Sequence, residues 1–233
     1  MKKPGWGVVV QGEPADLEDW AYTLKEPFDP WVQIDGDQTV LRSALFDELT
    51  SATDVRDRAI AYIDRLNGAI ALSQGARPLH FGGVVEFTPA GLQHRTIFAE
   101  MVTAEARSKA RAVATVIGPD GKPVSSPPQP SEVQSWAATA DDDDFLDDAL
   151  IYFGRATNWF DIYKTLECLI LRHGGSEAAF LALGWASEAE ITRLKRTANW
   201  ARHARRKFDP PKNPMPLRDA HALLGQLLRR ALH

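Results

Sequence analysis

The chain has 233 residues, 44% hydrophobic content and a net charge of −4, which is enough for two small domains with apolar cores and excludes a generally basic nucleic-acid coat protein. Its one cysteine, Cys168, excludes an internal disulfide and a multi-cysteine zinc site and is typical of a reducing compartment. No apolar run approaches the roughly 18 residues that span a bilayer, and the first residues lack a secretion signal, so we predict a cytoplasmic protein with no membrane partner.

The region 1–117 alternates strand and helix patterns. Residues 6–11 are apolar and β-branched, which favours a buried strand. The Asp-Gly pair at 35–36 lies between two short apolar runs and indicates a hairpin over 31–34 and 39–41. The other expected elements are a helix over 14–24, a helix over 53–72 with Asn67-Gly68 as an alternative end, a second hairpin over 79–88 and 92–102, and a strand over 112–117.

This order of strands and helices predicts an α+β protein whose N-terminal domain is a ferredoxin-like α/β sandwich with an added strand. Inside the expected strand 79–88, Gly82-Gly83 indicates either a β-bulge or a close approach by a ligand or another backbone. We favour the bulge.

The next segment breaks regular structure. Residues 118–130, GPDGKPVSSPPQP, combine turn and polyproline signals, so we expect a linker over 118–140. Six aspartates follow at 141–144, 147 and 148. A calcium loop needs alternating oxygen ligands and a turn glycine, which this segment lacks. We therefore interpret it as the acidic first turn of a helix, and we predict neither a metal nor a cofactor.

The region 141–233 is predicted to be a four-helix bundle. Apolar residues recur at spacings of four and three from Phe145 to Ile170, which predicts one continuous helix of about 30 residues. A short helix over 176–183 follows. The fourth helix is expected over 217–232, after a proline-rich connection over 208–216 that cannot be helical.

The third helix of this bundle has the clearest start. Ser187 and Glu190 fit a capping box, so the helix should begin near Glu188. Its expected inward stripe is Ile191, Leu194, Ala198 and Ala201.

Charge is divided unevenly along the chain. Residues 193–218 contain nine Lys or Arg and one acid, Asp209, a net charge of +8. Since residues 219–233 add +1, residues 1–192 must carry −13 to give the total of −4. One concentrated basic segment in an acidic protein indicates a site for a polyanion, such as RNA, or for an acidic partner.

Candidate site residues lie on this basic helix. Arg196, Asn199 and His203 follow at steps of three and four, which places a cation, an amide and an imidazole on one face. We predict these three as catalytic residues. The predicted nucleic-acid-binding residues around them are Trp200, Arg202, Arg205, Arg206 and Lys207.

In this helix Arg196 is followed by the polar Thr197, and six residues separate Arg196 from His203. A helical bundle with this motif on its penultimate helix resembles the HEPN superfamily over residues 141–233. The resemblance implies a metal-independent ribonuclease of the kind found in toxin-antitoxin and antiviral systems, with a composite site formed by two protomers. In the commonest family spacing an arginine stands where this chain has Ala198, directly before Asn199, so a degenerate, non-catalytic member is the alternative.

Two functional hypotheses follow. The first is a HEPN-like ribonuclease or toxin/defence-type effector that acts on RNA as a homodimer, with His203 as acid or base and Arg196 stabilising charge on phosphorus. In this hypothesis the acidic N-terminal domain is a sensor or regulatory module that contacts a protein partner. The second is a non-enzymatic helical interaction protein that binds a polyanion or a partner protein through the same basic helix, with His203 an ordinary surface residue.

Overall fold

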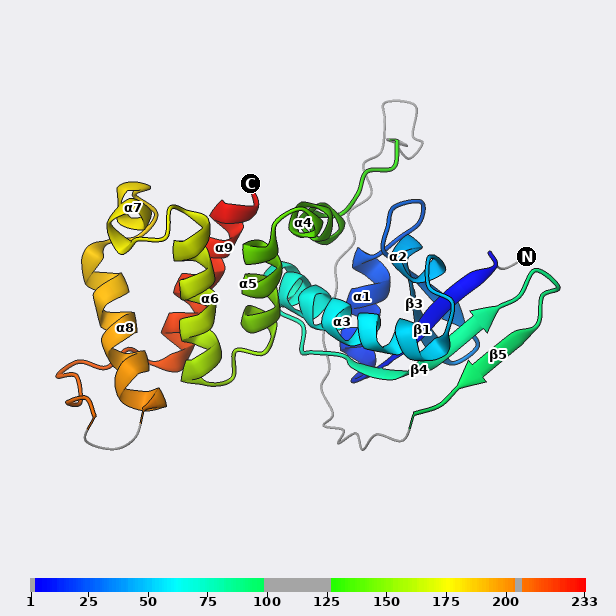
Figure 1. The fold of residues 1–233 in the computed structure, drawn as a ribbon, viewed down its shortest axis with the longest axis horizontal. Coiled ribbons are helices and arrows are strands. Elements are labelled where there is room, and N and C mark those ends of the chain that lie inside the picture. The colour runs from blue at the N-terminus through cyan, green and yellow to red at the C-terminus, as the bar shows by residue number, and fades with distance from the viewer. Residues whose placement is uncertain (1–2, 99–126, 204–206) are drawn as a thin grey trace, which may run out of the picture. The chain divides into compact units, whose positions relative to one another are not determined.

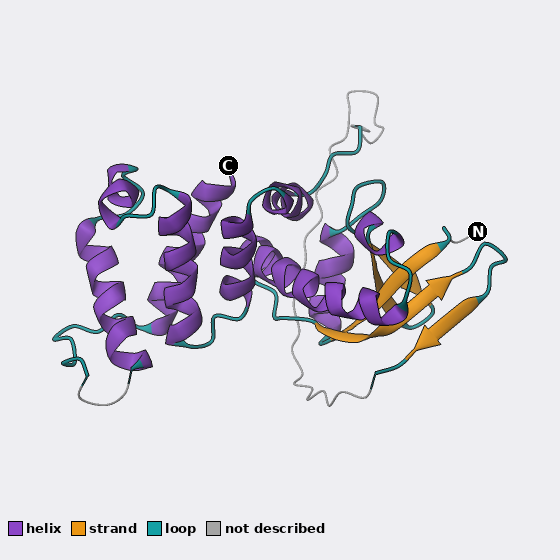
Figure 2. Cartoon of the chain, viewed as in Figure 1, coloured by secondary structure: helices purple, strands orange, loops and turns teal. Residues whose placement is uncertain are grey.

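The computed structural model describes residues 3–98, 127–203 and 207–233, and it is an α+β protein (Figures 1 and 2). The chain forms two compact units: Met1–Ala59 with Leu79–Gln134, and Ile60–Pro78 with Ser135–His233. The boundary after Gln134 falls within the expected linker over 118–140, but residues 60–78, which were expected in the N-terminal domain, belong with the C-terminal helices. Every helix in the described part of the chain is too short or too polar to cross a membrane.

The first unit contains an antiparallel sheet that, within the described residues, has five strands in the order β2-β3-β1-β4-β5. The elements up to β5 match the expected strands and helices, with a short additional helix α2, and helix α3 runs from the first unit into the second. The expected strand over 112–117 lies outside the described residues. The bounds are β1 Gly5–Gln11, α1 Pro14–Thr23, β2 Trp31–Asp35, β3 Gln38–Arg42, α2 Ala44–Asp47, α3 Ala52–Gln74, β4 His80–Phe87 and β5 Gln93–Thr96.

The predicted bulge lies on β4. Val9 pairs with Gly83 and Val10 with Phe81, so Gly82 is the extra, unpaired residue. A side chain at Gly82 would meet the side chain of Gln11 on the neighbouring strand. The prediction of a bulge is therefore confirmed.

Both faces of the sheet carry buried side chains. Successive residues of a strand point to opposite faces. Val9 belongs to a cluster with Val40, Val85 and Phe87. Val8 and Val10, on the other face of β1, are also buried. These apolar side chains supply the core of the first unit.

Helix α3 does not end at Asn67-Gly68 but continues to Gln74. Gly68 serves close packing instead: a Cβ atom added there would lie 2.7 Å from the carbonyl carbon of Leu150. The absent side chain thus allows two backbones to approach each other within the second unit.

Residues 132–140, expected as linker, form most of helix α4, Glu132–Asp141. The helix begins with a second capping box, in which Ser131 Oγ accepts from the Gln134 amide and Gln134 Oε1 accepts from the Ser131 amide. Gln134 Nε2 also donates to the carbonyls of Lys25, Phe28 and Pro30. The linker prediction is wrong here because the S-x-x-Q capping box and the helical spacing of the apolar residues favour a helix. Its apolar residues are all buried: Val133, Trp136, Ala137 and Ala140.

The second unit continues with α5 Asp144–Gly154, α6 Trp159–Arg172, α7 Glu177–Ala182, α8 Glu188–Arg202 and α9 Leu217–Leu232 (Figure 1). The prediction of one helix from Phe145 to Ile170 is wrong. Helix α5 ends at Gly154. A new helix, α6, begins after Asn158, whose side chain accepts hydrogen bonds from the amides of Phe160 and Asp161. Helices α5 and α6 therefore pack against each other rather than forming a single rod.

The aspartates before and within α5 meet arginines as well as the helix start. Asp143 caps α5 and accepts from Arg172 Nε at 2.6 Å. Burial raises the pKa of Asp143, but the Arg172 hydrogen bond and charge, with the amides of Leu146 and Phe145, bring it below its ordinary value. The expected acidic first turn is confirmed by Asp144 and Asp147.

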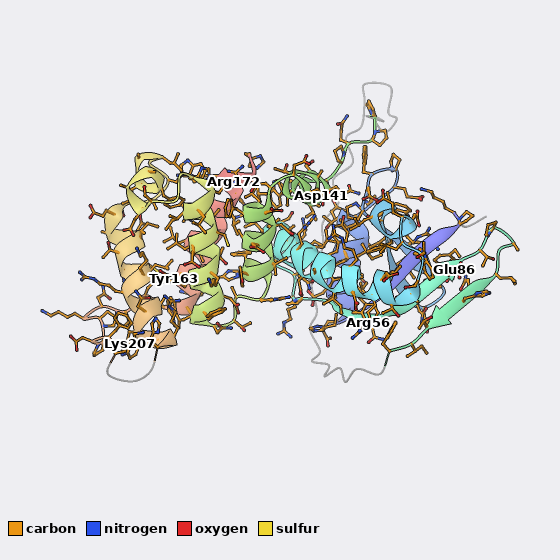
Figure 3. All side chains as sticks on the ribbon, in the orientation of Figure 1. Arg56, Glu86, Asp141, Tyr163, Arg172 and Lys207 are labelled. Carbon is orange, nitrogen blue, oxygen red and sulfur yellow. The ribbon has the colours of Figure 1, made fainter. Side chains whose placement is uncertain are left out.

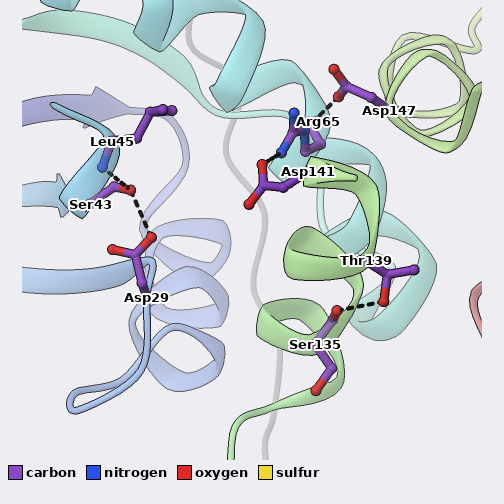
Figure 4. Close-up of polar contacts among 8 residues, drawn as sticks. All are labelled: Asp29, Ser43, Leu45, Arg65, Ser135, Thr139, Asp141 and Asp147. Carbon is purple, nitrogen blue, oxygen red and sulfur yellow. Dashed lines mark hydrogen bonds and ion pairs between the residues drawn. The ribbon is translucent and has the colours of Figure 1, made fainter. Parts of the chain in front are cut away.

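Arg65 of α3 contacts two of these acids. Its guanidinium lies between Asp141 and Asp147 and bonds to both carboxylates (Figure 4). The Arg65 side chain is 8% exposed, whereas that of Asp141 is 51% exposed. Three segments of the second unit are thus joined by one nearly buried cation.

Arg65→Met is expected to lower the free energy of unfolding by about 1–3 kcal/mol, less than for a fully buried pair because water screens Asp141. Urea unfolding followed by circular dichroism measures the change. Arg58→Met is the control, because Arg58 is exposed on the same helix. Equal losses in the two variants would contradict a structural role for the Arg65 ion pairs.

Candidate functional site

Helix α8 carries the predicted site, and its start is as expected. Ser187 Oγ accepts from the Glu190 amide, and Glu190 Oε2 accepts from the Ser187 amide. The Ser187 hydroxyl also donates to Glu190 Oε2 at 2.6 Å, and the hydrogen bonds that the carboxylate accepts from the Ser187 hydroxyl and amide lower the pKa of Glu190. The predicted stripe of Ile191, Leu194 and Ala198 is buried. Ala201 is exposed, contrary to expectation, because the helix ends one residue later.

Thr197, the polar residue after Arg196, has a structural role. It is buried. Its hydroxyl donates to the Arg193 carbonyl at 2.9 Å and accepts from the Met215 amide at 3.0 Å. Thr197 therefore fastens the end of the proline-rich connection to α8.

Arg193 fastens the same connection one turn earlier. Its Nε donates to the carbonyl of Asn213, and its Nη2 donates to Asn213 Oδ1 and to the carbonyl of Pro214, at 3.0–3.2 Å. None of these acceptors is charged. The guanidinium consequently holds the segment in place through neutral acceptors.

A cavity of about 760 Å³ lies between α8 and the segment 208–213. Helix α8 lines it with Arg193, Arg196 and Asn199, and the segment adds Lys212 and Asp209. Three cations therefore surround the cavity with one carboxylate. Figure 3 shows Lys207 beside the end of α8, where this segment begins.

Arg196 is the most available of these cations. Its side chain is exposed, and it has no hydrogen bond or ion pair with any residue that the structure describes. A guanidinium offers several donors in a fixed plane that matches the oxygens of a phosphate. The cavity is therefore suited to a phosphate group or another oxyanion.

Arg202 is bound to other side chains of the bundle. Its Nε and Nη2 donate to Asn199 Oδ1 at 3.2 and 2.9 Å, and its guanidinium lies 3.7 Å from the centroid of the Tyr163 ring on α6. This position is part-buried, so Arg202 contributes to the packing of α8 on α6. A direct role in binding nucleic acid remains a prediction for this residue.

His203 lies just beyond the helix. It is the C-cap residue of α8 with extended backbone angles, φ −97° and ψ 163°. Its ring packs on Phe208, with centroids 5.0 Å apart. Desolvation, with the charges of Lys207 and Arg202, lowers the pKa of His203 below its ordinary value and so favours the neutral ring.

The structure thus places two of the three predicted catalytic residues, Arg196 and Asn199, on the cavity. His203 is separated from Arg196 by a rise of about 10 Å along the helix axis, and its neighbour Phe208 lines the cavity. Arg205 and Arg206 lie outside the described residues. Trp200 and Lys207 are exposed.

Sequence reasoning missed the contribution of the proline-rich segment. Phe208, Asp209 and Lys212 line the cavity although nothing periodic marks them. The available signal was composition alone: a basic residue between prolines, directly after the basic helix. The described residues contain no cluster of three or more His, Cys, Asp or Glu side chains that could hold a metal ion.

Comparisons of the chain with protein-family models, with curated proteins and with solved structures find no match.

Proposed function

We propose that the cavity on α8 binds the phosphates of RNA and that the chain is a HEPN-like ribonuclease of the toxin or defence type, which cleaves RNA without a metal. One observation carries the proposal. The exposed guanidinium of Arg196, which has no partner among the described residues, lies in one cavity with Arg193 and Lys212.

The chemistry needs a base and a cation. In metal-independent cleavage the 2′-hydroxyl of RNA loses its proton and attacks the adjacent phosphorus, and the 5′-oxygen leaves. A neutral His203 is the proposed base, favoured by its lowered pKa. Arg196 would stabilise the negative charge that grows on the phosphoryl oxygens. A homodimer would bring two such sites together, as the HEPN resemblance implies.

The same proposal covers the rest of the chain. The antiparallel strand order β2-β3-β1-β4 supports a ferredoxin-like first unit with β5 as the added strand. Helices α5, α6, α8 and α9 pack on one another and support a four-helix bundle, in which α5 and α6 take the places of the long first helix and of the short helix expected over 176–183. We propose a cytoplasmic location, and a role for the first unit as a sensor that contacts a protein partner.

A second candidate function is supported by the position of His203. The cavity is lined by Phe208 and not by the His203 ring itself, and Thr197 is occupied by backbone groups. A protein that binds RNA or another polyanion through Arg196 without cleaving it would need only the cavity.

Incubation of the purified protein with total RNA in EDTA tests the proposal. Cleavage seen on a denaturing gel supports the ribonuclease, whereas binding without cleavage supports the second candidate.

Three phosphate contacts predict a fall in single-strand affinity of roughly 20-fold between about 50 and 200 mM salt. The absence of RNA binding at the lower salt concentration would contradict the ribonuclease, and it would leave the second candidate only for a polyanion other than RNA.

A further inference from the structure

Asn199 lines the cavity, and one end of its carboxamide is already bound on α8. Arg202, three positions later, donates to Asn199 Oδ1 through Nε at 3.2 Å and through Nη2 at 2.9 Å. A guanidinium carries N–H donors and no acceptor, so only the oxygen of the amide can face it. The contact therefore fixes which end of the Asn199 carboxamide is the oxygen and which is the nitrogen.

The nitrogen end of this carboxamide is left for the cavity. Among the described residues, none accepts a hydrogen bond from Asn199 Nδ2. Asn199 follows Arg196 by three positions, so the two side chains are neighbours on the helix surface, and both line the cavity. An amide nitrogen offers two N–H donors to an anion beside Arg196, whereas the amide oxygen would repel the same anion.

Arg202 is itself held in place by α6. Its guanidinium lies over the ring of Tyr163, 3.7 Å from the ring centroid, and Tyr163 belongs to α6 (Figure 3). The face of an aromatic ring attracts a cation. Arg202 is part-buried and does not line the cavity. Its Nε and Nη2 groups are therefore used for Asn199 and not for a ligand.

We infer that Arg202 is a positioning residue, which turns the Asn199 carboxamide so that Nδ2 donates to an oxygen of the phosphate bound by Arg196. This inference rests on the proposed function, and it gives Arg202 an indirect role in place of the direct contact with nucleic acid that the sequence predicts. Without Arg202 the carboxamide can turn over, because its oxygen and nitrogen ends have nearly the same size and shape. The site would then lose a donor and gain a repulsive acceptor.

A double-mutant cycle on the binding of pyrophosphate, measured by calorimetry, tests the inference. This probe has phosphate oxygens but no sugar or base. Arg202→Met removes the donors and keeps an apolar side chain against Tyr163, and it is expected to weaken binding roughly 10- to 150-fold, the range for loss of a hydrogen bond to a charged group. In the Asn199→Ala background the same change should have little effect, because the group through which Arg202 acts is gone. Equal weakening in both backgrounds would overturn the inference, since a direct effect of the Arg202 charge does not need Asn199.

The NMR signals of the Asn199 side-chain amide give a second readout, which stands whether or not Arg202→Met folds. These signals are identified by their absence from the spectrum of Asn199→Ala, and in the wild-type protein they should move as pyrophosphate is added. Signals that stay in place at saturating pyrophosphate would overturn the inference.

Two further outcomes separate this inference from the proposed function. Pyrophosphate binding with the expected coupling between Arg202 and Asn199, but with RNA left intact in EDTA, would support the inference and overturn the ribonuclease. RNA cleavage that depends on Arg196, with equal effects of Arg202→Met in both backgrounds, would overturn the inference alone. Failure of the wild-type protein to bind pyrophosphate would overturn the inference together with the phosphate site on which it rests.

Discussion

His203→Gln is expected to lower the rate of RNA cleavage at least about 100-fold, as loss of a general base does, with no change in melting temperature because His203 lies beyond the end of α8. The base must be deprotonated to act. Since the pKa of His203 is lowered, the cleavage rate of the wild-type protein should fall only as the pH drops below about 6.5. Initial rates measured in EDTA between about pH 5 and pH 8 check both statements.

A pair of arginine variants shows whether position or charge matters. Arg196→Gln is expected to reduce cleavage about 100-fold or more, the usual loss when one donor to a developing oxyanion is removed. Arg218→Gln removes the same charge from the same basic segment, but its side chain is 94% exposed and does not line the cavity. Similar losses in the two variants would contradict a catalytic role for Arg196 and favour binding by overall charge.

Gly68→Ala is expected to destabilise the second unit by about 3 kcal/mol, which corresponds to a fall in melting temperature of roughly 6–12 °C. The added Cβ atom would lie 2.7 Å from the carbonyl carbon of Leu150 and 3.2 Å from its Cα atom. These are backbone atoms, which cannot rotate away as a side chain does. Thermal unfolding followed by circular dichroism measures the shift.

Gly225→Ala is the matched control, because Gly225 also lies inside a helix. A Cβ atom there would contact Leu72 Cδ1 at 3.4 Å and the Phe153 ring at 3.5 Å, which are ordinary van der Waals distances. The gain in helix propensity, up to about 1 kcal/mol, should make this variant equal to or slightly more stable than the wild type. A Gly68→Ala variant as stable as Gly225→Ala would mean that the backbones of α3 and α5 separate freely.

Local signals in the sequence predicted elements well where one short motif decides the structure. The capping box at Ser187 gave the start of α8, and the Asp-Gly pair gave the turn between β2 and β3. The same class of signal is present at Ser131, where Gln134 completes the capping box that begins α4. At Asn158 the apolar spacing continues across the break, so periodicity alone does not distinguish one helix from two.

The cavity could not be predicted from local patterns. The segment 208–213 has no periodicity, and its position depends on two hydrogen bonds to α8: the Met215 amide donates to the Thr197 hydroxyl, and Arg193 donates to Asn213. Such bonds join residues 18 and 20 positions apart. The sequence therefore predicts the basic helix and Arg196, but it does not predict that the segment 208–213 packs against this helix and forms the other side of the cavity.

The second unit is built from two separate stretches of the chain, 60–78 and 135–233, which limits how the protein can be truncated or fused. The C-terminal helices receive partners from α3: Arg65 for Asp141 and Asp147, and the Leu72 carbonyl for Arg229. A fragment that starts at residue 131 would lack all of them. The helical unit is thus not a transplantable module, and a fusion or truncation that preserves it must retain residues 60–78 from far upstream, either in the same polypeptide or as a separately supplied peptide.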